Sequence, residues 1–327
     1  MCIRDSLTVS FACEKLGTVL FPGYDYAGEV IPVEIGIGTK LFEENPEVCY
    51  TLEKSDLSKF LPDRKKNSHK GSYGKILMIT GSKGMSGAAY LSARAAYISG
   101  GGLVQIYTEE SNRTILQQLL PEAIVSTYTE YEEEKLQSLL KWADVICIGC
   151  GLGKSRTAGQ ILSYLMKYAE VPCVIDADGL NLLADHMELL PKEKKPFVLT
   201  PHMKEMAGLL GCTIPELGKN RFAALKEFTD SYGVVCALKD ARTLVAGKDR
   251  QMFLNTAGNS AMAKAGSGDV LAGVITGLLA QHMKVYEGTV LGVYLHACGG
   301  DAARERRGAY SVLAEDLTEG IACLLYT

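Results

Sequence analysis

Short apolar runs alternate with longer helical segments along most of this chain. Residues 75–80 form a continuous apolar run typical of a buried strand, and residues 88–99 are an alanine-rich segment that predicts a helix. A glycine turn at 81–87 separates the two, and a second strand is predicted at 103–107. This stretch predicts a strand–helix–strand unit of a parallel sheet.

The alternation continues toward the end of the chain. Further strands are predicted at 144–148, 171–175, 197–200 and 234–238, with a hairpin at 243–246 and 251–254. Further helices are predicted at 112–120, 132–142, 157–168, 203–210, 215–231, 270–280 and 285–305. The predicted fold class is therefore α/β, an open sandwich with its ligands at the carboxyl ends of the strands.

The first 70 residues have a different pattern. Residues 7–45 hold a few short strands and turns, too little to form a domain alone. Residues 46–70 are polar and charged and predict a linker or a surface excursion. Residues 71–323 contain nearly all of the predicted elements and form the main unit.

Composition and charge exclude several classes of function. The chain has 327 residues, 47% of them apolar, which is enough to bury a substantial core. The formal net charge of -4 comes from mixed acids and bases, so nucleic acid is not a predicted partner. No apolar run approaches the ~18 residues of a membrane span and no signal-peptide core is present, so a cytoplasmic protein without a membrane partner is predicted.

Ten cysteines are scattered without the rhythm of a disulfide framework. Cys147 and Cys150 form the only Cys-x-x-Cys pair, and no second pair completes a zinc site. Reduced, buried thiols are predicted, with a redox or metal pair as the alternative.

A glycine turn with one carboxylate precedes the apolar helix predicted at 270–280. Gly266 and Gly268 let the backbone turn sharply, so that N–H groups converge at the positive end of the helix dipole. Asp269 lies in the first helical turn, where a general base can take a proton from a hydroxyl that meets a phosphoryl group. The alternative is that Asp269 only caps the helix.

Two other glycine turns match nucleotide motifs only in part. Residues 149–155 follow a strand and precede a helix, but a P-loop needs glycine where this chain has Ile148. We interpret this turn as a loop that closely approaches another ligand. The glycines of 81–87 lack the spacing of a dinucleotide fingerprint, so a Rossmann dehydrogenase is a weak alternative.

Polar residues follow the next predicted strands. Asp176, Asp178 and Asn181 lie at a strand end and helix start, where they either face a crevice or cap the helix. His202 can donate to a ligand phosphate or carbonyl, and Lys239 can bring an ammonium group to a diphosphate. Each of these residues could instead have a purely structural role, so only their combination indicates a ligand site.

Six motifs occur in a fixed order along the chain. They are Gly81-Ser-x-x-Met-x-Gly-Ala-Ala89, Gly149-x-Gly-x-Gly153, Asp176-Ala-Asp-Gly-Leu-Asn181, Leu199-Thr-Pro-His202, Lys239-x-x-x-Thr243 and Gly258-Asn-x-x-Met-Ala-x-x-Gly-Ser-Gly-Asp-Val-Leu-Ala-Gly273. Together they resemble the ADP/ATP-dependent NAD(P)H-hydrate dehydratase family. The resemblance covers residues from about 70 to 323. It implies a ribokinase-like three-layer α/β/α sandwich with a mostly parallel central sheet.

The resemblance implies a repair enzyme that restores NADH or NADPH from the S-epimer of its hydrated form. ADP, or ATP in eukaryotic members, would phosphorylate the ring hydroxyl, and phosphate would then leave. Mg²⁺ is implied by this chemistry, but no protein ligand for it is predicted. A homo-oligomer, often a tetramer, is the implied assembly. The residues themselves predict that Asp269 takes the hydroxyl proton while the N–H groups of 266–268 stabilise the transferred phosphoryl group.

The resemblance also implies which residues form the site. Those that would contact the hydrated dinucleotide are Ala88, Gly149, Gly151, Gly153, His202, Glu205 and Asp269. Those that would hold ADP or ATP are Lys239, Asp240, Ala241, Arg242, Thr243, Asn259, Met262, Ala263, Gly266, Ser267 and Gly268. Asp269 is the implied catalytic residue.

Residues 1–45 resemble the tail of the epimerase domain that precedes the dehydratase in many bacterial members. No epimerase activity is therefore expected of this chain. Residues 1–6 do not fit that tail, and 324–327 end in mid-helix, so both ends are interpreted as candidate sequence artefacts.

Two positions depart from the family pattern. Asp240 stands where glycine is common after the lysine of the Lys-x-x-x-Thr motif, and Ala265 stands where Gly-Gly is common. A carboxylate at 240 would repel a diphosphate unless it points away or helps to hold Mg²⁺.

Two other functions stay open. A small-molecule kinase of the same fold, such as a hydroxymethylpyrimidine or hydroxyethylthiazole kinase, would use the same turn but keep the phosphate on its product. A non-catalytic nucleotide-binding or scaffold fragment is the third possibility, against which the intact Asp269 and glycine turn argue.

Overall fold

A nine-stranded sheet forms the centre of the protein. The computed structural model describes residues 6–38, 40–43, 45, 47–190 and 195–325. The strand order is β11-β10-β9-β8-β7-β6-β3-β4-β5, and β10 pairs antiparallel with both β9 and β11, whereas the other neighbouring strands of the described sheet pair in parallel. The strands are β3 Lys75–Ile79, β4 Leu103–Glu109, β5 Ile124–Tyr128, β6 Val145–Ile148, β7 Cys173–Ile175, β8 Phe197–Leu199, β9 Val235–Leu238, β10 Leu244–Ala246 and β11 Phe253–Leu254.

The order in which the chain adds strands to the sheet reverses beside β3. From β3 it proceeds outward through β4 and β5, then returns to the other side of β3 and proceeds through β6 to β9. Ile76 of β3 is therefore paired with Val104 of β4 on one side and with Val145 of β6 on the other. The carboxyl ends of β3 and β6 form the switch point at which α/β sheets bind ligands.

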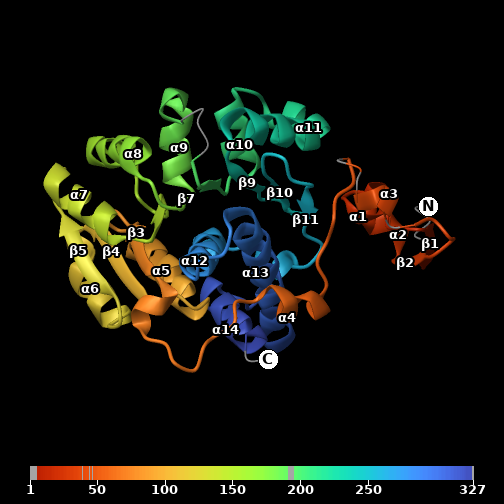
Figure 1. Ribbon diagram of the computed structural model, residues 1–327, viewed down its shortest axis with the longest axis horizontal. Coiled ribbons are helices and arrows are strands. Elements are labelled where there is room, and N and C mark those ends of the chain that lie inside the picture. Colours follow the sequence, from red (N-terminus) through yellow and green to blue (C-terminus); the bar gives the residue numbers. More distant parts are fainter. Residues whose placement is uncertain (1–5, 39, 44, 46, 191–194, 326–327) are drawn as a thin grey trace.

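Helices cover both faces of the sheet, as Figure 1 shows. One face carries α5, α6, α12, α13 and α14, and the other carries α7 to α11. This arrangement confirms the predicted three-layer α/β/α sandwich. The helices are α5 Ser86–Ile98, α6 Arg113–Leu119, α7 Glu133–Trp142, α8 Arg156–Tyr168, α9 Asp178–Ala184, α10 Met203–Leu210, α11 Ile214–Tyr232, α12 Ser267–Ala280, α13 Val285–Arg307 and α14 Ala314–Leu324.

Strand β3 has an apolar run because both of its faces are buried, each in a separate core. Ile76 and Met78 pack in the core under α5 and α12, whereas Leu77 and Ile79 pack in the core under α7 and α8. Successive side chains of a strand point to opposite faces, so a strand covered on both sides needs apolar residues throughout.

Helix α12 packs closely against α5, and glycine makes this possible. A Cβ at Gly273 would lie 2.1 Å from the carbonyl oxygen of Ser92, and one at Gly277 would lie 2.5 Å from that of Ala96. The alanine-rich sequence of α5 provides the matching flat surface. This contact fixes the first turn of α12 relative to the strand ends.

Most predicted elements are found within a few residues of their expected bounds. α12 begins at Ser267, earlier than predicted, so its first turn includes the glycine motif. Among the described strands and longer helices of residues 71–323, β5 and α14 had no predicted range. β5 is an edge strand in which Ile124 is 47% exposed, although its Ile-Val-Ser-Thr-Tyr sequence is rich in residues that favour strands.

The N-terminal residues form a small unit beside the β10–β11 edge of the sheet (Figure 1). Strand β1, Leu7–Phe11, pairs in parallel with β2, Glu29–Val33. Three one-turn helices accompany this pair: α1 Leu16–Val19, α2 Tyr24–Ala27 and α3 Lys40–Glu43.

The predicted linker 46–70 is packed along the main unit. It contains the short helix α4, Leu57–Phe60, and its Leu52 and Leu57 are buried in the core beside α13. Of the candidate artefactual ends, residues 1–5 and 326–327 lie outside the described part of the chain, as does residue 46 of the linker. Among the described helices, none has both the length and the apolarity needed to cross a bilayer.

Candidate active site

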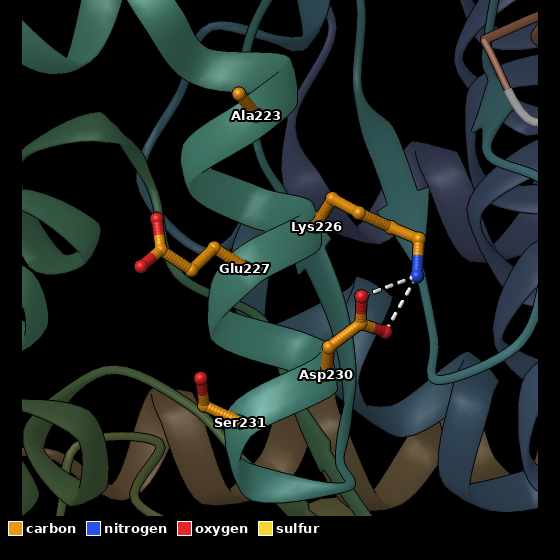
Figure 2. A pocket seen from close by; sticks show the side chains of 5 residues that line it. All are labelled: Ala223, Lys226, Glu227, Asp230 and Ser231. Carbon is orange, nitrogen blue, oxygen red and sulfur yellow. Dashed lines mark hydrogen bonds and ion pairs between the residues drawn. The ribbon is translucent and has the colours of Figure 1, made fainter.

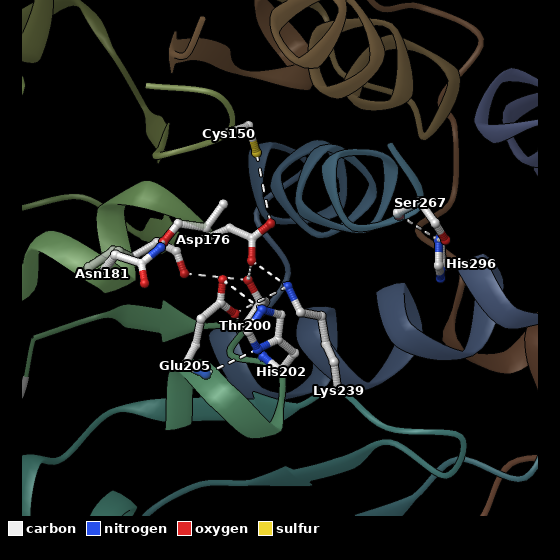
Figure 3. Close-up of polar contacts among 11 residues, drawn as sticks. Cys150, Asp176, Asn181, Thr200, His202, Glu205, Lys239, Ser267 and His296 are labelled. Atoms are coloured by element: carbon white, nitrogen blue, oxygen red, sulfur yellow. Dashed lines mark hydrogen bonds and ion pairs between the residues drawn. The ribbon is translucent and has the colours of Figure 1, made fainter. Parts of the chain in front are cut away.

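Three neighbouring strand ends bring polar residues together at the carboxyl edge of the sheet. Asp176 follows β7, Thr200 and His202 follow β8, and Lys239 follows β9 (Figure 3). Lys239 Nζ lies 2.6 Å from Oδ1 of Asp176, and Thr200 Oγ1 donates to the same oxygen at 2.8 Å. The side chain of Asp176 is only 2% exposed, so this ion pair is largely removed from water.

A second acid lies beside this pair. Glu205 Oε2 is 3.9 Å from Lys239 Nζ, and burial raises the pKa of Glu205 even though the ammonium group opposes this. Burial disfavours the charged form of Lys239 as well, but the charges of Asp176 and Glu205 outweigh it and raise the pKa of Lys239. Lys239 is therefore a fixed positive charge at this end of the sheet.

His202 and Glu205 begin helix α10 by capping each other's backbone. The N–H of Glu205 donates to Nδ1 of His202 at 3.0 Å, and the N–H of His202 donates to Oε2 of Glu205 at 2.8 Å. The His202 side chain is 51% exposed, whereas that of Glu205 is 6% exposed. His202 thus has a structural role and also presents an open ring edge.

Two glycines of the loop after β6 lie too close to neighbouring segments to carry a side chain. Gly149 has φ 119°, and a Cβ there would lie 1.9 Å from the carbonyl oxygen of Asp176. A Cβ on Gly151 would lie 2.8 Å from that of Ala88, near the start of α5. The loop therefore fits the space between β7 and α5 at the switch point.

The turn after Asp176 contains a strained residue. Ala177 has φ 47°, in the left-handed region that residues with a side chain rarely adopt. Its neighbours hold it in place. Asp178 Oδ2 accepts the N–H of Gly153 at 2.8 Å, and Asn181 Nδ2 donates to the Ala177 carbonyl at 3.1 Å.

Helix α12 presents its first turn to the same space. Gly266 precedes the helix with φ 91°, so the backbone turns sharply into Ser267 and Gly268. A Cβ on Gly268 would lie 3.6 Å from Lys239 Nζ and 3.7 Å from Oδ2 of Asp176. The helix N-terminus and the ion pair thus border one site, although they are far apart in sequence.

Asp269 lies half-buried in the first turn of α12. Burial and the charge of Asp176 raise the pKa of Asp269 to about 6, while a hydrogen bond from Cys150 and the charge of Lys239 act to lower it. A carboxyl group that titrates near neutral pH is suited to accept a proton from a substrate hydroxyl.

Two carboxylates at the site match the ligands that Mg²⁺ prefers. Ligand atoms of Cys150, Asp176 and Asp269 all lie within 4.8 Å of one another. Mg²⁺ takes oxygen ligands and retains water and substrate phosphate in its shell, whereas a thiol is too soft for it. Asp176 and Asp269 thus fit a Mg²⁺ ion that a nucleotide brings, and Cys150 does not.

Cys150 is a site residue that sequence reasoning missed. Its buried Sγ lies 3.9 Å from Oδ2 of Asp176. A hydrogen bond with Cys147 and burial raise the pKa of Cys150 well above its usual value, so the group is a neutral thiol. All described cysteines are free. The Cys-x-x-Cys spacing was the only signal for this contact, and spacing does not show which way the second thiol points.

Helix α13 anchors the motif that follows Asn255. Asp301 accepts the N–H of Gly258 at 3.0 Å and the side-chain amide of Asn259 at 2.7 Å. His296 Nε2 lies 2.9 Å from the carbonyl oxygen of Ser267. Burial lowers the pKa of His296 to about 4, so the neutral ring donates to that carbonyl.

Neither Asp301 nor His296 was predicted, because both lie in a long helix that carries no recognised motif. Met262, which was predicted, packs against α13: a Cβ at Gly300 would lie 2.2 Å from its sulfur. Ala263 is exposed at the end of the same turn.

The side chains of the loop after Lys239 point in different directions. Asp240 forms an ion pair with Arg221 of α11 at 2.8 Å and accepts the N–H of Ala241. Thr243 Oγ1 donates to the carbonyl of Asp240 at 3.3 Å. Arg242 is 7% exposed and turns toward the N-terminal unit. The acidic departure at 240 is thus paired with a cation on α11.

A separate hollow lies on the outer side of α11 (Figure 2). It is lined by Ala223, Lys226, Glu227, Asp230 and Ser231. Its polar groups come from one helix, and Lys226 pairs with Asp230 at 2.5 Å. The strand ends of Figure 3 instead gather groups from several elements, as ligand sites in α/β proteins do.

Known proteins share this sequence and fold. The sequence pattern of a family described as NAD(P)H-hydrate dehydratase matches residues 76–322. The bifunctional NAD(P)H-hydrate repair enzyme of Moorella thermoacetica is 37% identical over 97% of this chain, which spans 62% of that relative. The ADP-dependent (S)-NAD(P)H-hydrate dehydratase of Neisseria meningitidis is 38% identical over 78% of this chain and 86% of its own length.

Solved structures agree with the fold. The ADP/ATP-dependent NAD(P)H-hydrate dehydratase of Bacillus subtilis, co-crystallised with ATP/Mg²⁺, has a TM-score of 0.71 at 29% identity, covering 84% of this chain and 96% of its own. A ribokinase-like superfamily protein from Enterococcus faecalis has a TM-score of 0.77 at 30% identity, covering 84% of this chain and 95% of its own. The fold is therefore ribokinase-like, and the chain belongs to the NAD(P)H-hydrate dehydratase family.

Proposed function

We propose that this chain uses ADP to dehydrate the S-epimer of hydrated NADH or NADPH. The observation that carries the proposal is the position of Asp269, next to the glycine turn of α12 and beside the Lys239–Asp176 ion pair. One space thus holds a base, an anion-binding turn and a fixed cation. The relative from Neisseria meningitidis, whose name states this reaction, supports the choice of substrate.

In the proposed first step Asp269 accepts the proton of the ring hydroxyl. The hydroxyl oxygen then bonds to the terminal phosphorus of ADP, and the bond from that phosphorus to the bridging oxygen breaks, releasing AMP. The N–H groups of 266–268 stabilise charge on the transferred group, and Lys239 lies close enough to share this role.

In the second step the carbon–oxygen bond breaks and phosphate leaves. Phosphate is a far better leaving group than hydroxide, which is why phosphorylation makes the loss of water feasible. The neighbouring ring carbon gives up a proton to the departing phosphate or to water, and the electrons of that carbon–hydrogen bond form the ring double bond again, so that NADH or NADPH is released. Asp176, together with the nucleotide, would hold Mg²⁺, which would supply charge neutralisation for the phosphoryl groups, and Asp269 would stay free to act as the base.

An absorbance assay tests the proposal. Hydrated NADH, Mg²⁺ and ADP should restore absorbance at 340 nm, and each reagent should be required; ATP in place of ADP tests the alternative co-substrate. Asp269→Asn should lose turnover by about 10²–10⁴-fold while still binding ADP. A phosphorylated vitamin precursor without recovery of absorbance would instead identify the chain as a small-molecule kinase.

We further propose that residues 7–45 belong to an epimerase unit. The bifunctional name of the relative from Moorella thermoacetica supports this. A homotetramer and a cytoplasmic location stay predictions. Light scattering after size-exclusion chromatography tests the first, and a fluorescent fusion tests the second.

A further inference from the structure

The guanidinium group of Arg242 connects three segments of the chain. Arg242 lies in the loop between β9 and β10 and is 7% exposed. Its Nε donates to the carbonyl oxygen of Val19 at 3.2 Å, and its Nη1 donates to the carbonyl oxygen of Thr256 at 2.5 Å. It thus joins the N-terminal unit to the motif that begins at Asn255.

Two aromatic rings of the N-terminal unit lie against this guanidinium. Its carbon is 4.4 Å from the ring centre of Tyr24 and 5.6 Å from that of Phe21. The two rings are 5.3 Å apart and meet edge to face. Arginine is attracted to aromatic faces at such distances, and more strongly where water is excluded. The N-terminal unit therefore holds Arg242 by hydrogen bonding and by its rings.

Other contacts fix the N-terminal chain at the same sheet edge. The N–H of Tyr50 donates to the carbonyl of Met252 at 3.0 Å, and the N–H of Leu254 donates to the carbonyl of Tyr50 at 2.9 Å. Gln251 Nε2 donates to the carbonyl of Phe42 at 3.3 Å. The chain that follows the Arg242 contact is thus attached to the hairpin, which Figure 1 shows beside the N-terminal unit.

Arg242 is also connected to the segments that form the proposed nucleotide site. Three residues earlier in its loop is Lys239, which pairs with Asp176. The N–H of Asn255 donates to the carbonyl of Thr243 at 2.9 Å, so the loop and the next motif are also joined here. That motif continues to Asn259. Both segments implied to hold the nucleotide therefore meet at Arg242.

We propose that Arg242 is a positioning residue, through which the segment 16–24 sets the nucleotide affinity of the site. Arg242 would hold the two nucleotide-binding segments in register, because its Nε and Nη1 donate to carbonyls of two different segments and its face lies against aromatic rings. This role replaces the direct nucleotide contact that the resemblance implies for Arg242. The inference rests on the proposed use of ADP at this site.

Calorimetric titration of the full chain with ADP and Mg²⁺, together with KM measurements, tests the proposal. Arg242→Ala and Tyr24→Ala should each raise the Kd and KM for ADP by about fivefold or more, the low end of coupling between sites. The KM for the hydrate should change less than twofold. Tyr26→Ala is the matched control, since Tyr26 lies in the same short helix and is 46% exposed, as is Tyr24.

Combined and conservative variants identify the path of the effect. The double variant Arg242→Ala/Tyr24→Ala should bind ADP no more weakly than Arg242→Ala alone, because both changes break one connection. Tyr24→Phe keeps the ring and should bind like wild type. These readouts separate a positioning role from a general loss of stability.

Three outcomes would overturn the inference. If Arg242→Ala weakens ADP binding but Tyr24→Ala does not, Arg242 contacts the nucleotide directly. If both variants lower the melting temperature but leave the Kd for ADP unchanged, the junction only supports the fold. Wild-type protein that binds no ADP overturns the proposed function and this inference with it. Where Arg242→Ala does not fold, Tyr24→Ala against Tyr26→Ala decides alone.

Discussion

Lys239 and Asp176 form an ion pair of 2.6 Å across the end of the strand that lies between theirs. Thr200 of that middle strand donates to the same carboxylate oxygen. The pair thus ties β7, β8 and β9 together at the edge where the substrate would bind. It also sets the charge balance around Asp269, since one partner raises the pKa of that group and the other lowers it.

Lys239→Met should destabilise the protein strongly, because it leaves the buried carboxylate of Asp176 without its partner. We expect a loss of about 3–5 kcal/mol in the free energy of unfolding, measured in urea at pH 7. The double variant Lys239→Met/Asp176→Asn should lose less than the sum of the two single changes. A loss below about 1 kcal/mol for Lys239→Met, the level of an exposed pair, would contradict this account.

The pH dependence of activity should follow the ionisation of Asp269. Its pKa of about 6 predicts that kcat/KM rises with pH and is half-maximal near pH 6, because only the carboxylate accepts a proton. An acid limb centred near pH 4 would mean that Asp269 is exposed in solution or is not the base.

The same shift predicts how stability depends on pH. Folding raises the pKa of Asp269 from 3.8 to about 6, so the folded state binds the proton more tightly and this group destabilises the fold as pH rises through that window. Asp269→Asn should therefore be more stable than wild type at pH 7, by on the order of 3 kcal/mol. The difference should vanish below about pH 3, where the group is protonated in both states.

Cys150→Ala should move the acid limb of kcat/KM to higher pH. The thiol of Cys150 lowers the pKa of Asp269 by hydrogen bonding, so its removal should raise that pKa. Cys173→Ala is the control, because Cys173 is equally buried in the adjacent strand β7 and is not among the groups that shift Asp269. Equal shifts in both variants would assign the effect to packing.

Arg221→Ala should weaken ADP binding by leaving Asp240 unpaired. The partly exposed carboxylate would then repel a diphosphate, raising the KM for ADP roughly two- to fivefold at low salt and less at high salt. Adding Asp240→Gly should restore the wild-type KM. Arg250→Ala, which removes the comparable surface pair with Glu287, should leave the KM for ADP unchanged.

Local patterns were sufficient to predict much of this molecule. The apolar run of β3 and the glycine turns after β3 and β6 are encoded within a few residues, because strands and turns depend on nearby side chains and on glycine dihedral angles. The rule that parallel strands present their carboxyl ends at one edge then brings His202 and Lys239 into one site.

Contacts between distant segments could not be predicted in the same way. Cys150 beside Asp269, and Asp301 beside Asn259, depend on how α12 and α13 pack, which no short motif encodes. The direction of Arg242 depends on the N-terminal unit, so its place in a binding motif gave no indication of its buried contacts. The edge strand β5 is a different case, because its β-branched and aromatic residues favour a strand and the local pattern could have predicted it.

The mutual cap of His202 and Glu205 limits which atoms the imidazole can recognise. While Nδ1 accepts the amide of Glu205, the neutral ring carries its only hydrogen on Nε2. Nε2 lies 3.5 Å from Oε1 of Glu205, so an incoming molecule has to offer a lone pair in competition with this carboxylate. A phosphate or carboxamide oxygen can do so, and an amino group cannot. The cap that starts helix α10 thereby also selects for ligand groups that accept a hydrogen bond.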